Sequence, residues 1–222
     1  MPTDNPTLIA ARRWQRRPEA RPEEILDAAL VVFGESGFAR AKIDDVARLA
    51  GVSKGTVYLY YDSKEALFRE MVRAKIVASL AEGEELVRSH TGSARELLPE
   101  LVRRMYVRMR DEGMSRIARV VQAELMHFPE LARFYFDEVI LRARRLVEQV
   151  LARGVASGEF RPSSLAFGAR GLTSLLVHTA HTQCFFHQFD PQSLADEEAL
   201  RGLLDLYLHG VLARADAAGP GV

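Results

Sequence analysis

Apolar side chains recur every three or four residues along most of this 222-residue chain, and no segment alternates apolar and polar residues. The first pattern is typical of amphipathic helices, whereas strict alternation is typical of half-buried strands. The clearest early stripe, at i, i+3, i+4, i+7 and i+8, consists of Ile25, Ala28, Ala29, Val32 and Phe33. We therefore predict an all-α fold without strands.

Prolines, glycines and capping residues divide this pattern into successive helices. Pro22 suits a first helical turn, Gly37 suits a helix end, and Ser53 is a good N-cap. The expected helices cover residues 21–37, 43–50, 53–61, 62–80 or beyond, 92–110, 114–126, 130–157, 163–186 and 196–215.

The charges balance overall but are unevenly distributed. The 30 basic and 30 acidic side chains give a net charge of zero, which taken alone argues against a nucleic-acid-binding protein. Residues 12–21, however, hold five arginines against Glu19, a net charge of +4, and residues 190–205 carry a net −4. We interpret residues 1–21 as a flexible basic arm, which either contacts phosphates or is a solvated tail.

The number of cysteines and the length of the apolar stretches indicate the cellular compartment of the protein. The single Cys184 excludes an intrachain disulfide, which fits a reducing cytoplasm. The N-terminal residues contain no apolar run of the kind that signal peptides have. The longest apolar stretches are far shorter than a membrane span. We expect a cytoplasmic protein that does not enter the membrane.

Two short helical patterns meet at Gly51, and together they predict a helix-turn-helix. Gly51 would provide the sharp turn, and Ser53 would cap the second helix, whose N-terminal end then points outward. We expect the inner side of the motif to be formed by Val46, Ala47, Leu49, Ala50, Val52 and Val57.

Three of the six tyrosines lie within four positions of the second helix, at Tyr58, Tyr60 and Tyr61. Tyr61 follows Val57 by four residues, so we assign both mainly to packing. Tyr58 and Tyr60 would then reach DNA phosphates, sugars or thymine methyl groups. The alternative is that these tyrosines lie at the rim of an unrelated helical bundle with wet hydroxyls.

The residues around the tyrosines suggest further contacts with a duplex. Lys54 and Thr56 would address base edges in the major groove, and Gly55 would let the backbone approach closely. Lys64 begins the next helix, where its ammonium and the free backbone N–H groups could hold a phosphate. Alternatively, both lysines are simply solvated.

Residues 23–70 resemble the DNA-binding domain of the tetracycline-repressor (TetR) family of one-component transcriptional regulators. The resemblance rests on Ile25–Ala29 (ILDAA), Phe33, Gly37-Phe38, Ile43–Ala47 (IDDVA), Ala50–Tyr58 (AGVSKGTVY), Tyr60-Tyr61 and Ser63–Leu67 (SKEAL). It implies an all-α homodimer with a helix-turn-helix domain of three helices at residues 22–68. It also implies a larger helical domain for effector binding and dimerisation at 69–215, followed by a tail at 216–222.

Carried over residue by residue, the resemblance implies contacts with a double-stranded DNA operator. They fall on Lys54, Gly55, Thr56, Tyr58, Tyr60 and Lys64. Lys42 stands where the family often has a serine or threonine cap, so a side-chain acceptor is lost, and a lysine there could meet a phosphate instead. Tyr61 replaces the usual phenylalanine, and Asp62 stands where proline or a small residue is common.

The larger domain carries no comparable signature. Flexible or aromatic side chains suit an adaptable pocket for an apolar or amphipathic effector, although they also suit an ordinary core. The pocket candidates are Met105, Met109, Leu125, Phe134, His178 and His181.

The spacing H-x2-H-x2-C-x2-H in His178, His181, Cys184 and His187 suggests a metal site. On a regular helix each step of three residues turns back by about 60°, so the first and last histidines point in opposite directions. An adjacent pair could share an ion, but all four could not. Capping or core histidines are the alternative, and we expect no metal and no cofactor.

No glycine-rich phosphate loop, serine nucleophile elbow or HExxH motif is present, so we expect no enzyme. We expect a repressor that binds a palindromic operator as a dimer and is released by a small-molecule effector. Dimerisation would pair residues 163–186 and 196–215 in a four-helix bundle through Leu172, Leu175, Leu203, Tyr207 and Val211. The alternatives are packing within one chain and a helical interaction protein that has lost operator binding.

Overall fold

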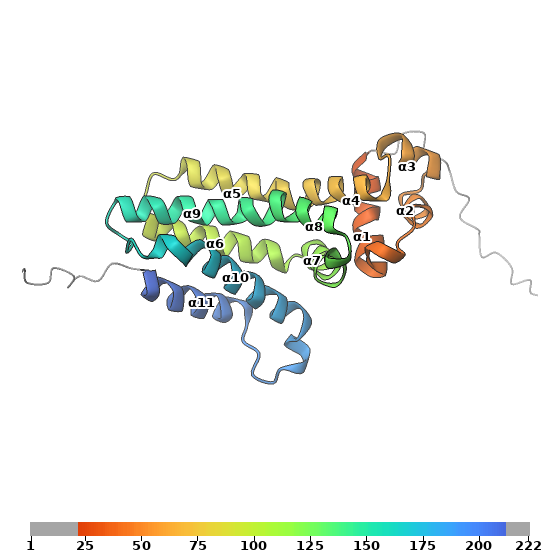
Figure 1. The fold of residues 1–222 in the computed structure, drawn as a ribbon. Coiled ribbons are helices and arrows are strands. Elements are labelled where there is room, and N and C mark those ends of the chain that lie inside the picture. Colours follow the sequence, from red (N-terminus) through yellow and green to blue (C-terminus); the bar gives the residue numbers. More distant parts are fainter. Residues whose placement is uncertain (1–21, 212–222) are drawn as a thin grey trace, which may run out of the picture.

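The computed structural model describes residues 22–211, and the arm and tail expected at 1–21 and 216–222 lie outside these residues. The described chain is all-α, as predicted, with no strand in it. Figure 1 shows a small head of three helices at one end of a bundle of longer helices. The head contains α1 (Pro22–Arg40), α2 (Ile43–Ala50) and α3 (Lys54–Tyr60).

The rest of the fold consists of long helices that run away from the head and back (Figure 1). They are α4 (Lys64–Val72), α5 (Ala78–Ser89), α6 (Ala94–Arg110), α7 (Glu112–Glu124), α8 (Pro129–Tyr135), α9 (Leu141–Ala156), α10 (Ser164–Phe185) and α11 (Asp196–Val211). Short 3₁₀ turns follow α7 at Leu125–His127 and α10 at His187–Phe189.

Two π-helical turns, which the sequence pattern did not predict, interrupt otherwise continuous helices. Arg73–Val77 joins α4 to α5, and Phe136–Ile140 joins α8 to α9. The two turns contact each other, and the Arg73 guanidinium lies 5.1 Å from the centre of the Phe134 ring. A π turn inserts one residue into a helix without removing its apolar stripe, so hydrophobic periodicity does not reveal it. The expected boundary at residues 68 and 69 falls inside the first of these helices and remains a prediction.

The core of the larger domain is centred on α6, which packs against α5, α9 and α10. A capping box begins α6, because the Ser93 hydroxyl accepts from the Glu96 N–H and the Glu96 carboxylate accepts from the Ser93 N–H, both at 3.2 Å. The fully buried side chains here include Leu97, Leu98, Leu101, Val102, Val147, Val150, Leu151, Leu172 and Leu176. Each large apolar side chain buried in this way contributes roughly 1.5–3 kcal/mol.

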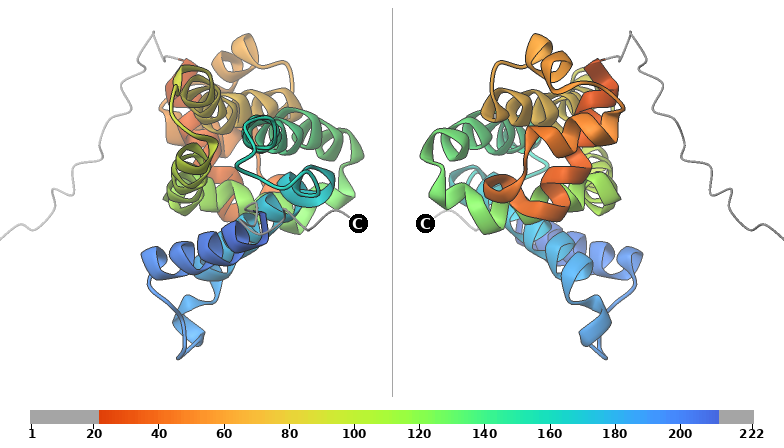
Figure 2. Two further views of the ribbon diagram at one scale, coloured as in Figure 1. Left: turned by 90° about the vertical axis from the view of Figure 1, so that its left-hand side faces the viewer. Right: turned by 90° about the vertical axis from the view of Figure 1, so that its right-hand side faces the viewer.

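Figure 2 shows α11 and the C-terminal end of α10 extending away from one side of this bundle. α10 packs against α9 and α6, whereas α11 packs mainly against α10. The outer sides of α10 and α11 therefore have few intrachain partners.

Gly154 gives a test of the packing between α9 and the segment that follows it. A Cβ atom at this position would overlap the ring of Phe160, which is fully buried. We expect Gly154→Ala to lower the free energy of unfolding by about 1–3 kcal/mol, because overpacking outweighs the gain in helix propensity. Thermal unfolding measures this, and adding Phe160→Leu should recover part of the loss. A Gly154→Ala protein as stable as the wild type would contradict the close approach.

Candidate nucleic-acid interface

The turn between α2 and α3 is built around Gly51. Its φ of 72° lies in the left-handed region, which a glycine adopts without steric cost. The N–H of Val52 then donates to the carbonyl of Ala47 at 2.9 Å, which closes the end of α2. Ser53 caps α3, as predicted, because its hydroxyl accepts from the Thr56 N–H at 3.1 Å. The direction of α3 is thus fixed by backbone geometry.

The inner side of α3 packs as predicted for two of its residues. Val57 and Tyr61 are buried, and the Tyr61 hydroxyl donates to the carbonyl of Pro22 at 3.3 Å. The prediction for Leu49 was wrong, because its side chain is 54% exposed. On α2 it lies about 160° around the helix from Ala47, outside the narrow face that is buried.

The outer side of α3 lies at the edge of the head farthest from the bundle (Figure 1). Tyr58 and Tyr60 are 43% and 46% exposed, so their rings can meet a partner without unfolding the head. Lys42, Lys54 and Gly55 are also exposed, and Thr56 is half-buried. Direct contact of these residues with DNA stays a prediction. Leu59 is exposed as well, so α3 presents an apolar side chain that the sequence pattern had not suggested.

Lys54 has a partner on the neighbouring helix. Its ammonium Nζ lies 2.8 Å from the Asp44 carboxylate, and both side chains are more than half exposed. The hydrogen bond from Lys54 lowers the pKa of Asp44, and the same bond raises the pKa of Lys54. Sequence reasoning missed this pair, because the two residues are ten positions apart on different helices.

The structure gives Lys64 a role different from the expected phosphate contact. Its ammonium donates to the carbonyls of Phe38, Ala39 and Ala41 at 2.8, 3.0 and 3.3 Å. It also lies 4.7 Å from the centre of the Phe38 ring. These three bonds use all three donors of the ammonium, so the side chain holds the segment between α1 and α2 instead.

The head is joined to the larger domain mainly through α1 and α7, which pack along each other. The carboxylate of Glu124, at the end of α7, accepts the Ala39 N–H at 2.5 Å. Phe38 stacks edge-on against Phe128 with ring centres 4.9 Å apart. Hydrogen bonding and aromatic packing therefore both connect the head to the segment that follows α7.

The six effector candidates differ in burial and position, and their role in binding an effector stays a prediction. Met105 and Leu125 are buried, and Met109 is half-buried. His178 is exposed, whereas burial and then the neighbouring His178 lower the pKa of His181. Phe134 lies elsewhere, beneath the guanidinium groups of Arg69 and Arg73. Met105 and Met109 on α6 and the histidines on α10 do belong to adjacent helices.

Two hollows lie among charged side chains instead of inside the apolar core. One, of about 370 Å³, is lined by Arg69, Pro129, Glu130, Arg133, Phe134 and Asp137. The other, of about 350 Å³, is lined by Glu84, Arg142, Arg145, Leu146 and Gln149. Of the six candidates only Phe134 lines either of them.

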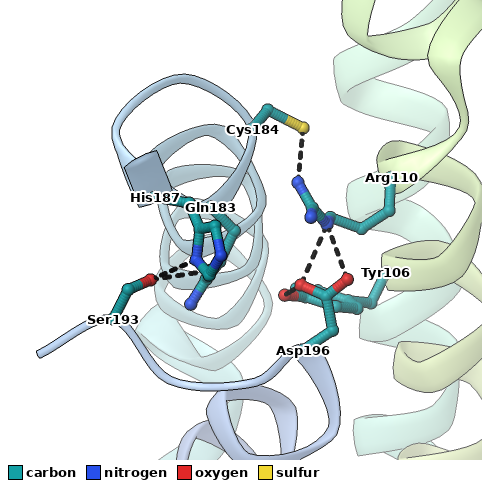
Figure 3. A network of polar contacts seen from close by, with 7 residues as sticks. All are labelled: Tyr106, Arg110, Gln183, Cys184, His187, Ser193 and Asp196. Carbon is teal, nitrogen blue, oxygen red and sulfur yellow. Dashed lines mark hydrogen bonds and ion pairs between the residues drawn. The ribbon is translucent and has the colours of Figure 1, made fainter. Parts of the chain in front are cut away.

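A polar network not suggested by the sequence joins α6 to the ends of α10 and α11 (Figure 3). The Tyr106 hydroxyl and the Arg110 guanidinium both donate to the Asp196 carboxylate at 3.0 Å. A second nitrogen of Arg110 lies 2.8 Å from the Cys184 sulfur. Burial first, and then the bond to Asp196, raise the pKa of Tyr106 to about 12, so it remains a donor at neutral pH. The network fixes the start of α11 against α6.

In the histidine and cysteine cluster of residues 178–187, Cys184 and His187 have other partners in the structure. No group of three or more metal-ligating side chains is placed there to hold an ion. The ring of His187 bonds the Ser193 hydroxyl at 2.6 Å, and Cys184 faces Arg110.

The expected dimer residues divide into two groups. Leu172, Leu203 and Val211 are buried within the chain, which disfavours them as direct dimer contacts, and their role in a dimer stays a prediction. They fill the contacts that α10 and α11 make with each other and with the bundle. Leu175 is exposed and Tyr207 half-buried. The exposed apolar side chains on these helices are Leu165, Phe167, Leu175, Val177 and Leu206.

Within residues 22–211, none of the helices has the length and apolar character that crossing a membrane requires.

Lys64 allows its structural role to be tested. We expect Lys64→Ala to lower the free energy of unfolding by about 1–3 kcal/mol, because three carbonyls lose a charged donor. The control is Lys42→Ala, which removes an exposed lysine and should leave stability within about 0.5 kcal/mol of wild type. Denaturant unfolding measures both. Equal stability of the two variants would contradict the role of Lys64 in the fold.

Comparison with known proteins agrees with this arrangement. Residues 25–71 match the family model described as "Bacterial regulatory proteins, tetR family". Residues 96–209 match the model described as "AefR-like transcriptional repressor, C-terminal domain". Together the two matches include both the head and most of the larger domain.

Individual relatives and solved structures are also transcriptional regulators. The HTH-type transcriptional repressor KstR2 of Rhodococcus jostii is 34% identical over 142 residues, which cover 64% of this chain and 68% of KstR2. The fatty acid metabolism regulator protein of Bacillus subtilis is 27% identical over 66% of this chain and 73% of its own.

The crystal structure of the regulator FadR from Bacillus subtilis in complex with stearoyl-CoA has the same fold. The TM-score is 0.72 at 20% identity, and the match covers 86% of this chain and 99% of FadR. With both family models matched and a relative above 30% identity, the chain belongs to the TetR family of bacterial transcriptional regulators.

Proposed function

We propose that this regulator is a repressor that binds a palindromic operator as a homodimer and is released by a small-molecule effector. The observation that carries the proposal is the outer face of α3. It presents Lys54, Gly55, Tyr58 and Tyr60 at the free edge of the head, while Val57 fixes the helix from within. A short helix held in this way can enter a major groove, with its polar N-terminal residues at base edges.

We further propose that the effector is a fatty acyl-CoA or a related thioester. The support is the similarity to a fatty acid metabolism regulator and to FadR, whose structure contains stearoyl-CoA. An acyl chain needs an apolar site, and the half-buried Met109 between α6 and its neighbours is a flexible side chain of the kind that suits one. The exposed Arg145 on α9 suits the phosphates of the nucleotide portion, whereas the neighbouring Arg142 is paired with Glu84 at 2.7 Å.

Release requires the effector to bind one conformation of the protein more tightly than another. The contacts between α7 and the head provide a route for such a change. A ligand that moves α6 or α7 would also move Glu124 and Phe128, which bond and pack against Ala39 and Phe38. The two heads of a dimer would then lose the spacing that an operator requires.

The homodimer is proposed from the outer faces of α10 and α11. Phe167 and Leu206 are 66% and 71% exposed, although both are large apolar side chains. Leu165, Leu175 and Val177 are exposed on the same pair of helices. Burying such a surface against a second copy would form a four-helix bundle and place two heads on one duplex.

The function is tested by selecting binding sites from random duplex DNA with the purified full-length protein. We expect enrichment of a sequence with two-fold symmetry, whose half-sites lie about one helical turn apart. Stearoyl-CoA should release the selected duplex, measured by fluorescence anisotropy, whereas free CoA should not. A protein that enriches no sequence would refute operator binding and leave a helical interaction protein as the better description. Enrichment without release by any acyl-CoA would refute only the effector class.

The dimer is tested by placing a charge on its proposed surface. Phe167→Glu and Leu206→Glu should convert a dimer to a monomer in sedimentation measurements, because each would bury an unpaired carboxylate. The control is Met126→Glu, which changes an even more exposed apolar side chain outside α10 and α11 and should stay dimeric. A monomeric wild type, or dimeric variants, would contradict the proposal.

A further inference from the structure

We propose that Asp44 determines specificity by positioning Lys54: it holds the ammonium until base-edge acceptors of the correct sequence replace the carboxylate. The inference rests on the proposed operator binding. It adds a residue that neither the sequence motif nor the similarity to other regulators assigns to DNA recognition.

The geometry places the two groups on the reading face itself. Lys54 is the first residue of α3, and Asp44 is the second residue of α2. Their charged atoms are 2.8 Å apart although both side chains are more than half exposed. An ion pair as exposed as this contributes little to folding stability. Its main consequence is that it holds the Lys54 ammonium beside the Asp44 carboxylate.

The pair also changes the charge of the surface that meets the duplex. Arg48 is paired with Asp45, and Lys54 with Asp44. In the stretch 42–60, every residue of which the structure describes, Lys42 is therefore the one basic side chain without an ion pair. A surface on which two of three cations are paired with carboxylates attracts phosphates less strongly, and non-specific binding depends almost entirely on phosphates.

At base edges, Lys54 can replace its bond to the Asp44 carboxylate with bonds to base acceptors. The O6 and N7 atoms of guanine are two acceptors in the major groove, and they can replace the two oxygens of a carboxylate. A duplex with other bases at that position offers no such replacement. It leaves the Asp44 carboxylate near phosphates, where like charges repel. Asp44 thus lowers the affinity for wrong sequences more than for the right one, which raises specificity.

The experiment compares two duplexes, one selected by the wild-type protein from random DNA and a scrambled duplex of the same length. Asp44→Asn keeps the size of the side chain and removes its charge. We expect tighter binding to the scrambled duplex, and a ratio of the two affinities that falls roughly tenfold. For the scrambled duplex, the slope of log affinity against log salt concentration should become steeper by about one, because Lys54 is free to meet a phosphate there.

Two controls separate this effect from a general change in charge. Glu85→Gln removes a carboxylate from an exposed ion pair with Arg88 at the far end of α5, and it should change neither the ratio nor the salt slope. In a Lys54→Ala background, Asp44→Asn should no longer change the ratio, because the lysine on which it acts is absent. Asp44→Ala should reproduce the effect of Asp44→Asn, and thermal unfolding confirms that each variant is folded.

The outcomes distinguish this inference from the proposed function. If the wild type binds its selected duplex and Asp44→Asn leaves the ratio and the salt slope unchanged, the inference is wrong and operator binding stands. If Asp44→Asn has the same effect with and without Lys54, Asp44 does not act through that lysine and the inference is also wrong. A wild type that selects no sequence refutes operator binding and this inference together.

Discussion

The structure depends on the packing of α1 between two partners. One side of this helix buries Phe33, which with Phe38 and with Phe68 of α4 forms an aromatic cluster. Another part of its surface packs along α7 of the larger domain. Because one helix belongs to both cores, the head cannot change its angle without altering contacts in the larger domain. A regulator that must couple ligand binding to DNA binding needs a connection of this kind.

The glycine contacts show how closely α1 and α7 approach. A Cβ atom on Gly34 would come within 2.7 Å of the Arg116 Cβ, which leaves no room for a larger residue without moving a helix. Near the end of α1, Gly37 has a φ of 77°, and the Glu124 carboxylate bonds the N–H of Ala39 just beyond it. The junction thus combines a close helix contact, a backbone turn and a charged hydrogen bond. Closely packed junctions of this kind switch between two discrete packing arrangements more readily than they deform continuously.

Most of the cations near the outer face of the head already have partners within the protein. The head has several cations near its outer face, but carboxylates on α2 pair with two of them, and three backbone carbonyls occupy Lys64. In the proposed operator complex Lys54 would exchange Asp44 for DNA, whereas the exposed Lys42, Tyr58 and Tyr60 could contact DNA without losing an ion pair. The proposed exchange would let a chain with a net charge of zero discriminate between duplexes, because selectivity would depend on exchange of partners and less on bulk attraction.

The sequence by itself determined the helices and the order in which they occur. Local rules act within a few residues, so Gly51 predicted the turn, Ser53 the cap of α3, and the spacing of Val57 and Tyr61 their burial. Tertiary structure decided the rest, because contacts between distant residues leave no local pattern. It brought Asp44 to Lys54 and the Phe38 carbonyl to Lys64, and it buried Leu172 within the chain while leaving Leu175 exposed. An apolar stripe shows that a helix face is buried, but only the positions of the other helices decide which residues that face contacts.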